Sequence, residues 1–278
     1  MSSCGCAPDP GGAREPRFRD FPTPDYLPAM DWGAWGQRIA DGARRFWNGR
    51  GEKKPWLRRV LAIIAFLLIP GPILYLLIFR FLPIPFTPEM VINLMTLNET
   101  HYSWAGDSVS PYLSQAVIAS EDQKFCRHHG FDWDEINHAI KTHERHPKKK
   151  LRGASTLSQQ TARTLFLVPW RSWVRKGVEA YLTVLMEFLW PKDRILEAYV
   201  NTVDFGHGNF GAEAAAQSYF HIPSSALNPY QAARLAAVLP DPDVWNAVKS
   251  GPYVTRRTRT IVGRMGQVRR DALNWCVR

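Results

Sequence analysis

Glu121 is the residue whose setting most suggests acid–base chemistry. It ends the apolar stretch "PYLSQAVIASED", where helical spacing puts it on the same face as Leu113 and Val117. An apolar wall disfavours the charged form of a carboxylate and raises its pKa, which is one way to prepare a general acid or base. An acid that simply ends a helix fits this stretch equally well.

A second glutamate follows a group of cations. In "RSWVRKGVEAYL", Arg171, Arg175 and Lys176 precede Glu179, and a helix would bring the last two cations next to the carboxylate. This pattern fits a cationic site for phosphate with a second acid beside it. It also fits an ordinary surface ion pair.

The stretch "LRGASTLSQQTARTLFL" gathers neutral hydrogen-bonding side chains behind a glycine. They are Ser155, Thr156, Ser158, Gln159 and Gln160. Hydroxyl and amide groups suit sugar hydroxyls or diphosphate oxygens. The alternative is a polar cap at the start of a helix.

Metal and dinucleotide motifs are not favoured. The histidines include no HExxH arrangement and the cysteines no CxxC, so we predict no protein metal ligands. His129-Gly130 is interpreted as a turn before a helix that begins near Asp132. The glycines of "FGHGNFG" match G-x-G-x-x-G, but a helical pattern precedes them, so we expect a tight loop that opens the alanine-rich helix "AEAAAQSYF".

The elements that must position these residues begin with one apolar span. Residues 60–79, "VLAIIAFLLIPGPILYLLIF", are 20 residues without a charge, about the length of a membrane-crossing helix. Pro70 and Pro72 would kink this helix. Four basic residues lie just before the span, whereas only Arg80 follows closely. This asymmetry predicts a signal anchor with a cytoplasmic N-terminus.

The rest of the chain is organised around this span. We expect a disordered tail at 1–30, an amphipathic basic cytoplasmic segment at 31–59, the anchor at 60–79, a connector at 80–110 and a periplasmic domain at 111–278. Helical spacing dominates the last of these, so the predicted fold class is mainly α. Cys126 and Cys276 fall on the exported side, where a disulfide is permitted, and the sequence leaves their pairing open.

Charge narrows the class of partner. The chain of 278 residues has 35 Lys and Arg against 25 Asp and Glu, a formal net charge of +10. This favours an anionic partner, which could be nucleic acid, a phosphate-bearing substrate or a membrane surface. Composition does not choose among these partners, whereas the apolar span favours the membrane.

Taken in order, these stretches resemble the peptidoglycan glycosyltransferase family (glycosyltransferase family 51), the lysozyme-like transglycosylase domain also found in bifunctional penicillin-binding proteins. "SEDQKFCRHHGFD" is similar to the family's first motif and "RGASTLSQQTARTLFL" to its second. Residues 175–220 are similar to the third and fourth motifs, and "LNPYQAARLAAVLPDPDVWNA" is similar to the fifth. The likeness is greatest to monofunctional biosynthetic members, because the chain lacks the S-x-x-K of a transpeptidase.

The resemblance implies a lysozyme-like domain that acts on lipid II, a disaccharide-pentapeptide carried on undecaprenyl diphosphate. Glu121 would be the general base of an inverting transfer, and Glu179 would be the second glutamate, near the leaving diphosphate. Substrate would be bound by the neutral and basic residues of the second and third motifs, namely Ser155, Thr156, Gln159, Gln160, Arg163, Arg171, Arg175 and Lys176.

The resemblance also implies a growing glycan strand as partner, no nucleic acid, and a single-pass protein of the bacterial inner membrane with a periplasmic catalytic domain. It leaves room for a divalent cation, Mg or Mn, and for cell-division or elongation proteins. Three positions depart from the family pattern: Arg163 replaces lysine, His207 replaces an acid and Ala154 replaces glycine. Two rivals stay open: a membrane-anchored muramidase of similar fold, and a non-catalytic cell-wall scaffold.

Overall fold

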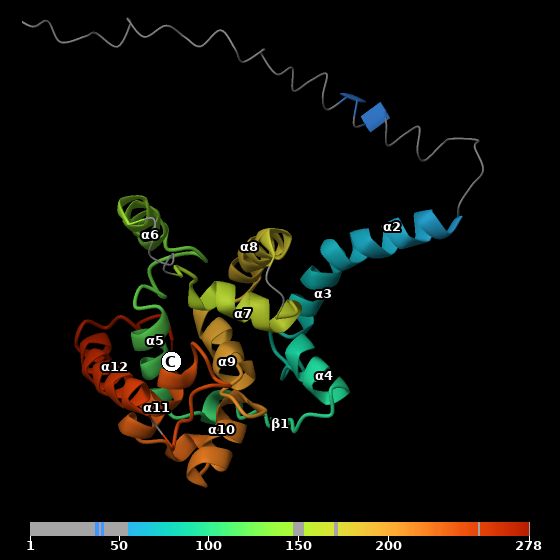
Figure 1. Ribbon diagram of the computed structural model, residues 1–278. Helices are drawn as coiled ribbons and strands as arrows, with labels where there is room; N and C mark the ends of the chain where they lie inside the picture. Colours follow the sequence, from blue (N-terminus) through green and yellow to red (C-terminus); the bar gives the residue numbers. More distant parts are fainter. Residues whose placement is uncertain are drawn as a thin grey trace, which may run out of the picture. The chain divides into compact units, whose positions relative to one another are not determined.

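The computed structural model describes residues 37–38, 40–41, 55–146, 153–169, 172–249 and 251–277. Contacts divide the chain into two units, Met1–Val60 and Leu61–Arg278. The described elements are α2 (Pro55–Leu68), α3 (Pro70–Ile78), α4 (Pro88–Met95), β1 (His101–Tyr102), η1 (Gly106–Ser108), α5 (Pro111–Glu121), α6 (Trp133–Arg145), α7 (Leu157–Phe166), α8 (Trp173–Leu189), α9 (Lys192–Thr202), β2 (Asn209–Phe210), α10 (Gly211–Phe220), η2 (Ser224–Ala226), α11 (Pro229–Val238) and α12 (Pro252–Arg270). The prediction of a mainly α fold is confirmed (Figure 1).

The apolar span is helical and mostly exposed. Among the described residues, one helical stretch, Trp56–Ile78, has the 23-residue length and the apolar composition of a membrane-crossing segment. It is divided at Ile69 into α2 and α3, and Pro70 is the first residue of α3. Proline has no backbone N–H to donate to the preceding turn, so the predicted break lies where the sequence puts it.

The end of the span is fastened to the helices of the second unit. Trp190 Nε1 donates to the carbonyl oxygen of Leu76 at 2.6 Å. The Arg194 guanidinium donates to the carbonyl oxygen of Phe79 at 2.7 Å. The last carbonyls of a helix have no partner within it, so these two side chains supply the missing donors and fix the exit from α3.

The core of the second unit surrounds α5. This helix packs against α11 and α12, while α7 packs against α8 and α9 (Figure 1). Five side chains of α5 are buried: Leu113, Ala116, Val117, Ile118 and Ala119. Alanines fill much of α10 and α11, and their small side chains let these helices approach closely. The packing holds the C-terminal end of α5 in a fixed place.

Helix starts follow the capping signals in the sequence. α5 begins at Pro111, as expected. α6 begins after Asp132, whose side chain accepts the N–H of Glu135 at 3.0 Å. The stretch 80–110, expected as a connector, contains α4, which packs against α7, and strand β1.

The glycine-rich loop before α10 is tight, as predicted. Gly206 and Gly208 have φ of 93° and 73°. A Cβ on Gly208 would lie 1.9 Å from the carbonyl oxygen of Glu99, so only glycine fits. The loop thereby lets β2 pair in parallel with β1, with His101 opposite Asn209.

Candidate active site

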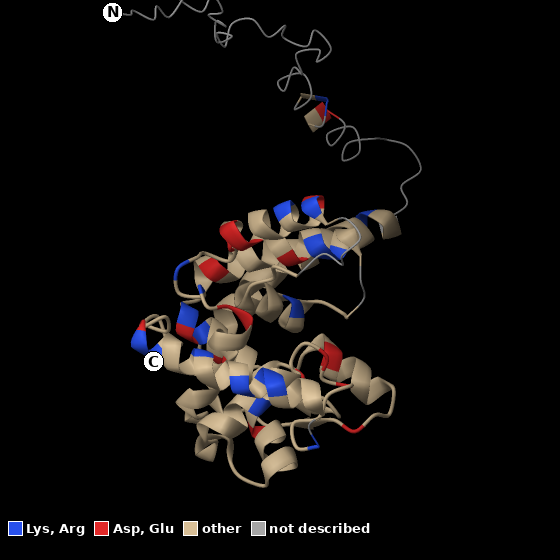
Figure 2. Cartoon of the chain, turned by 60° about the vertical axis from the view of Figure 1, so that its left-hand side comes forward, with Lys and Arg blue, Asp and Glu red and all other residues tan. Residues whose placement is uncertain are grey.

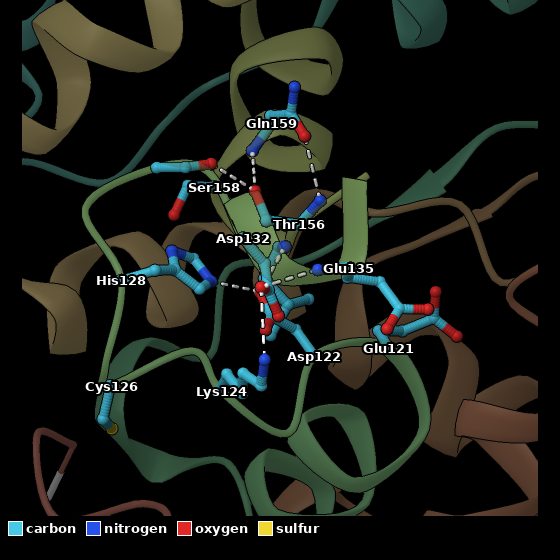
Figure 3. Close-up of polar contacts among 12 residues, drawn as sticks. Glu121, Asp122, Lys124, Cys126, His128, Asp132, Glu135, Thr156, Ser158 and Gln159 are labelled. Carbon is cyan, nitrogen blue, oxygen red and sulfur yellow. Dashed lines mark hydrogen bonds and ion pairs between the residues drawn. The ribbon is translucent and has the colours of Figure 1, made fainter. Parts of the chain in front are cut away.

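A buried carboxylate joins the end of α5 to the start of α7. Asp122 accepts the N–H of Leu157, the first residue of α7, at 3.0 Å, and lies 2.8 Å from His128 Nε2. Thr156, drawn beside Gln159 in Figure 3, donates to the carbonyl oxygen of Gly130 at 2.6 Å. These bonds satisfy groups at the N-terminus of α7 and fix the adjacent Glu121 relative to that helix.

The Glu121 carboxylate has one neutral and one cationic donor. Oε2 accepts from Gln160 Nε2 at 3.1 Å, and Oε1 accepts from the Arg257 guanidinium at 3.0 Å. Tyr199 donates to Gln160 Oε1 at 2.8 Å. Burial, reinforced by the charge of Glu121, raises the pKa of Tyr199 well above 10, so its hydroxyl stays protonated. The tyrosine therefore orients the amide so that its NH₂ group faces Glu121.

The sequence predicted that Glu121 shares an apolar helix face and that its carboxylate lies against an apolar wall. The first prediction is confirmed and the second is wrong. Leu113 and Val117 are fully buried on α5, as the spacing predicted. The Glu121 side chain is 13% exposed, and its carboxylate contacts Gln160 and Arg257 instead of an apolar wall. Sequence spacing missed Arg257 because it lies 136 positions away on α12.

Glu179 is buried between two cations of its own helix. It is 2% exposed. Arg175 donates to Oε2 at 3.1 Å, and Lys176 contacts Oε1. Lys176 also donates to the Ser155 hydroxyl at 3.1 Å. The alternative of an ordinary surface ion pair is wrong, because the carboxylate has left solvent and depends on both cations.

Three of the other predicted site residues lie at a helix cap or on the protein surface. Thr156 and Gln159 form a capping box at the start of α7, so their buried polar groups serve the helix. Arg163 is exposed on α7, and its charge opposes the burial that raises the pKa of Glu89. Arg171 lies outside the described residues. Substrate contacts by these four residues stay predictions.

A polar cavity extends from Glu121 to Ser155. Its volume is about 260 Å³, and Glu121, Ser155 and Arg264 are among the residues that line it. The Ser155 hydroxyl accepts a hydrogen bond from the Lys176 ammonium. The cavity therefore extends from Glu121 to a hydroxyl that contacts one of the cations paired with Glu179. Such a cavity can hold a polar ligand between a proton acceptor and a positive charge.

A helical domain with Glu121 on a polar cavity and Glu179 held by two cations fits the lysozyme-like class. Comparison with known proteins identifies the family. The family model described as Transglycosylase matches residues 89–266, and the chain belongs to this family. It is therefore an enzyme that transfers glycosyl groups, as the resemblance predicted.

Three relatives are each named biosynthetic peptidoglycan transglycosylase. The protein from Caulobacter vibrioides is 46% identical over 222 residues, which is 80% of this chain and 96% of the relative. The one from Rhodospirillum centenum is 46% identical over 78% of this chain and 93% of its own length. The one from Pectobacterium carotovorum is 43% identical over 81% of this chain and 95% of its own length.

Proposed function

We propose that the chain polymerises lipid II into peptidoglycan glycan strands, with inversion at the anomeric carbon and release of undecaprenyl diphosphate. One observation supports the proposal: the cavity is lined by Glu121 and by Ser155, and the Ser155 hydroxyl accepts a hydrogen bond from Lys176, which with Arg175 pairs with Glu179. Glu121 suits a sugar hydroxyl and the two cations suit a diphosphate. The names of the relatives support peptidoglycan as the product.

Glu121 is the proton acceptor in this proposal. It takes the proton of the acceptor sugar's 4-hydroxyl as that oxygen attacks the anomeric carbon of the donor. The bond between this carbon and the diphosphate oxygen breaks, and its electron pair leaves with the diphosphate. Gln160 and Arg257 hold one carboxylate oxygen each, which leaves further lone pairs on both oxygens for the incoming proton.

Arg175 and Lys176 stabilise the negative charge that grows on the leaving diphosphate. Glu179 fixes the positions of both cations. The Ser155 hydroxyl, which lines the cavity, accepts a hydrogen bond from the Lys176 ammonium. Trp173 and Val174 directly precede the cations on α8 and are 91% and 79% exposed. Apolar side chains beside a cation pair match a ligand whose diphosphate carries a lipid chain.

A divalent cation stays a prediction for this chain. No group of three or more His, Cys, Asp or Glu that could hold a metal ion occurs within the part of the chain that the structure describes. The Glu179 carboxylate is already paired with two cations. The residues present therefore do not fit a protein metal centre, and the mechanism includes no step through one.

We also propose that the enzyme is a single-pass protein of the inner membrane with a periplasmic catalytic domain. Arg58 and Arg59 precede most of the span, and Arg80 follows it, so basic charge is greater on the N-terminal side. A disulfide joins Cys126 and Cys276, and such bonds persist in oxidising compartments. Cell-division or elongation proteins stay predicted partners.

Reporter fusions test this topology. A cytoplasmic reporter fused after Pro10 should be active and one fused after Lys150 inactive, with the reverse result for a periplasmic reporter. Activity of the cytoplasmic reporter at Lys150 would overturn the orientation and with it the proposed substrate side.

Incubation of the purified full-length protein with labelled lipid II tests the reaction. Gel electrophoresis should show long glycan strands that a muramidase digests, and Glu121→Gln should serve as the inactive control. A second reaction offers preformed glycan alone. Shortening of that glycan without extension of lipid II would identify a muramidase, and no change in either substrate would identify a scaffold.

A further inference from the structure

The disulfide ties the turn after α12 to the segment that follows Glu121. Cys126 is 8% exposed and lies five residues beyond Glu121, and its Cα is 5.5 Å from that of Cys276. The loop between Glu121 and Cys126 passes Asp122 and Lys124 (Figure 3). The Cys276 N–H also donates to Cys126 Sγ at 3.3 Å. The bond therefore joins two segments that are 150 positions apart in the chain.

α12 carries the only charged group among the described residues that is bonded directly to the Glu121 carboxylate, the Arg257 guanidinium. Yet two features of the α12 sequence weaken the helix. It contains six arginines and no Asp or Glu between Pro252 and Arg270, so no acidic side chain of the helix offsets their charge, and Arg256 and Arg259 repel each other at i, i+3 spacing. Gly263 and Gly266 interrupt its interior, and glycine disfavours helix more than any residue except proline.

One face of α12 opposes these tendencies by packing on α5 and α11 through Val254, Thr258, Ile261, Met265 and Val268. The opposite face is exposed and basic, and Lys and Arg segments lie beside the C-terminal end in Figure 2. After Arg270 the chain turns back, and Leu273 N–H donates to the carbonyl oxygen of Val268 at 2.9 Å. Beyond this turn, the disulfide attaches Cys276 to Cys126.

We infer that the Cys126–Cys276 bond is a positioning element for the reaction, because it keeps α12 helical against α5 and so keeps Arg257 on Glu121. The inference rests on the proposed role of Glu121 as the proton acceptor. Without the bond, α12 separates more often from α5. The carboxylate then loses one of its two donors and its fixed orientation in the cavity, and the rate of the chemical step falls while substrate binding is kept.

The test uses the full-length protein with Cys126→Ala and Cys276→Ala together, assayed with lipid II below its unfolding temperature. We expect kcat to fall about tenfold while KM changes less than about twofold. Hydrogen exchange at α12 amides should accelerate in the same variant without any substrate present. A kcat within about twofold of the native value would overturn the inference.

Two further comparisons separate positioning from general loss of stability. In an Arg257→Gln background, removal of the disulfide should lower kcat by less than about twofold, because the group it positions is gone. Gly263→Ala should restore much of the lost rate, because a Cβ there meets nothing within 4 Å and alanine favours helix. If removal of the disulfide lowers kcat as much in the Arg257→Gln background as in the native protein, the inference is contradicted.

Gly177→Ala on α8 is the matched control, since a Cβ at Gly177 also meets nothing within 4 Å. It should raise the unfolding temperature without restoring kcat of the disulfide-free enzyme. Equal rescue by both alanines would show that the bond acts only through global stability. If the native protein itself fails to polymerise lipid II, the proposed function is refuted. Hydrogen exchange at α12 amides, which needs no substrate, then tests by itself whether the disulfide keeps α12 in place.

Discussion

Glu121 and Glu179 are both carboxylates at the proposed reaction site, but their environments are built differently. Glu121 is bonded by side chains from α7 and α12, and only one of these is charged. Glu179 is buried at 2% exposure between two cations from its own helix, α8. The first environment comes from tertiary packing and the second from helical spacing.

This difference supports the proposed role of Glu121, rather than Glu179, as the proton acceptor. Glu121 lines the cavity, and its two donors leave part of each oxygen accessible to a ligand. Glu179 is enclosed by opposite charge, so its negative charge serves to hold Arg175 and Lys176. In the proposed mechanism, different groups therefore carry out proton transfer and diphosphate binding.

The largest expected effect is that of Glu121→Gln. Glutamine keeps the shape of the side chain but cannot accept the proton, so the polymerisation rate should fall at least about a hundredfold. Lipid II should still bind with nearly native affinity. Gel analysis of glycan strands measures the rate, and fluorescence of labelled lipid II measures the affinity. Loss of binding in proportion to the loss of rate would mean that Glu121 is a ligand and not a base.

Glu179→Gln should have a smaller effect of another kind. The substitution removes the counter-charge of Arg175 and Lys176, so the diphosphate should leave more slowly and kcat should fall about tenfold. Single-turnover and steady-state rates of lipid II polymerisation separate transfer from release. The prediction fails if only the transfer step slows and release is unchanged.

Tyr199→Phe tests the role of Gln160, the neutral donor to the Glu121 carboxylate. The phenylalanine cannot donate to Gln160, so the amide loses its fixed orientation and kcat should fall roughly threefold, as expected for one lost hydrogen bond. Steady-state kinetics at fixed pH measure the change. Gln160→Ala should remove the effect of Tyr199→Phe, and independent losses from the two substitutions would contradict the proposed chain of bonds.

Asp204 is a half-buried carboxylate that accepts the Gly206 N–H. Burial raises its pKa from 3.8 to about 7, the charges of Glu89 and Asp243 add to the shift, and the Gly206 N–H opposes it. Because the folded pKa lies above the unfolded one, the native protein loses stability as pH rises from about 4 to about 7.

Asp204→Asn removes this pH dependence. We expect the variant to be about 2 kcal/mol more stable than the native protein at pH 8 and no more stable at pH 4. Thermal unfolding at the two pH values measures the difference. Equal differences at both values would show that protonation of Asp204 is not the cause.

Local features of the site could be predicted from the sequence. The pairing of Glu179 with Arg175 and Lys176 follows from helical spacing, and the break of the apolar span follows from Pro70. These features depend on residues within one or two helical turns.

The contacts that distinguish Glu121 could not be predicted in this way. Arg257 reaches the Glu121 carboxylate from α12, and Tyr199 reaches the Gln160 amide from α9. The Cys126–Cys276 bond joins residues that are 150 positions apart. Such contacts depend on how the helices pack, which periodicity within one helix does not determine. The role of Gln160 as a partner of Glu121 also emerged only from that packing.

The central claim is that Glu121 and Glu179 have different roles. The affinity of the protein for farnesyl diphosphate is the measurement that tests this claim. Calorimetry of the native protein, Glu121→Gln and Glu179→Gln measures this affinity without any reaction. The account predicts that Glu179→Gln binds the diphosphate about fivefold more tightly, because two cations lose their counter-charge, and that Glu121→Gln stays within about twofold of native. A larger change for Glu121→Gln than for Glu179→Gln would contradict it.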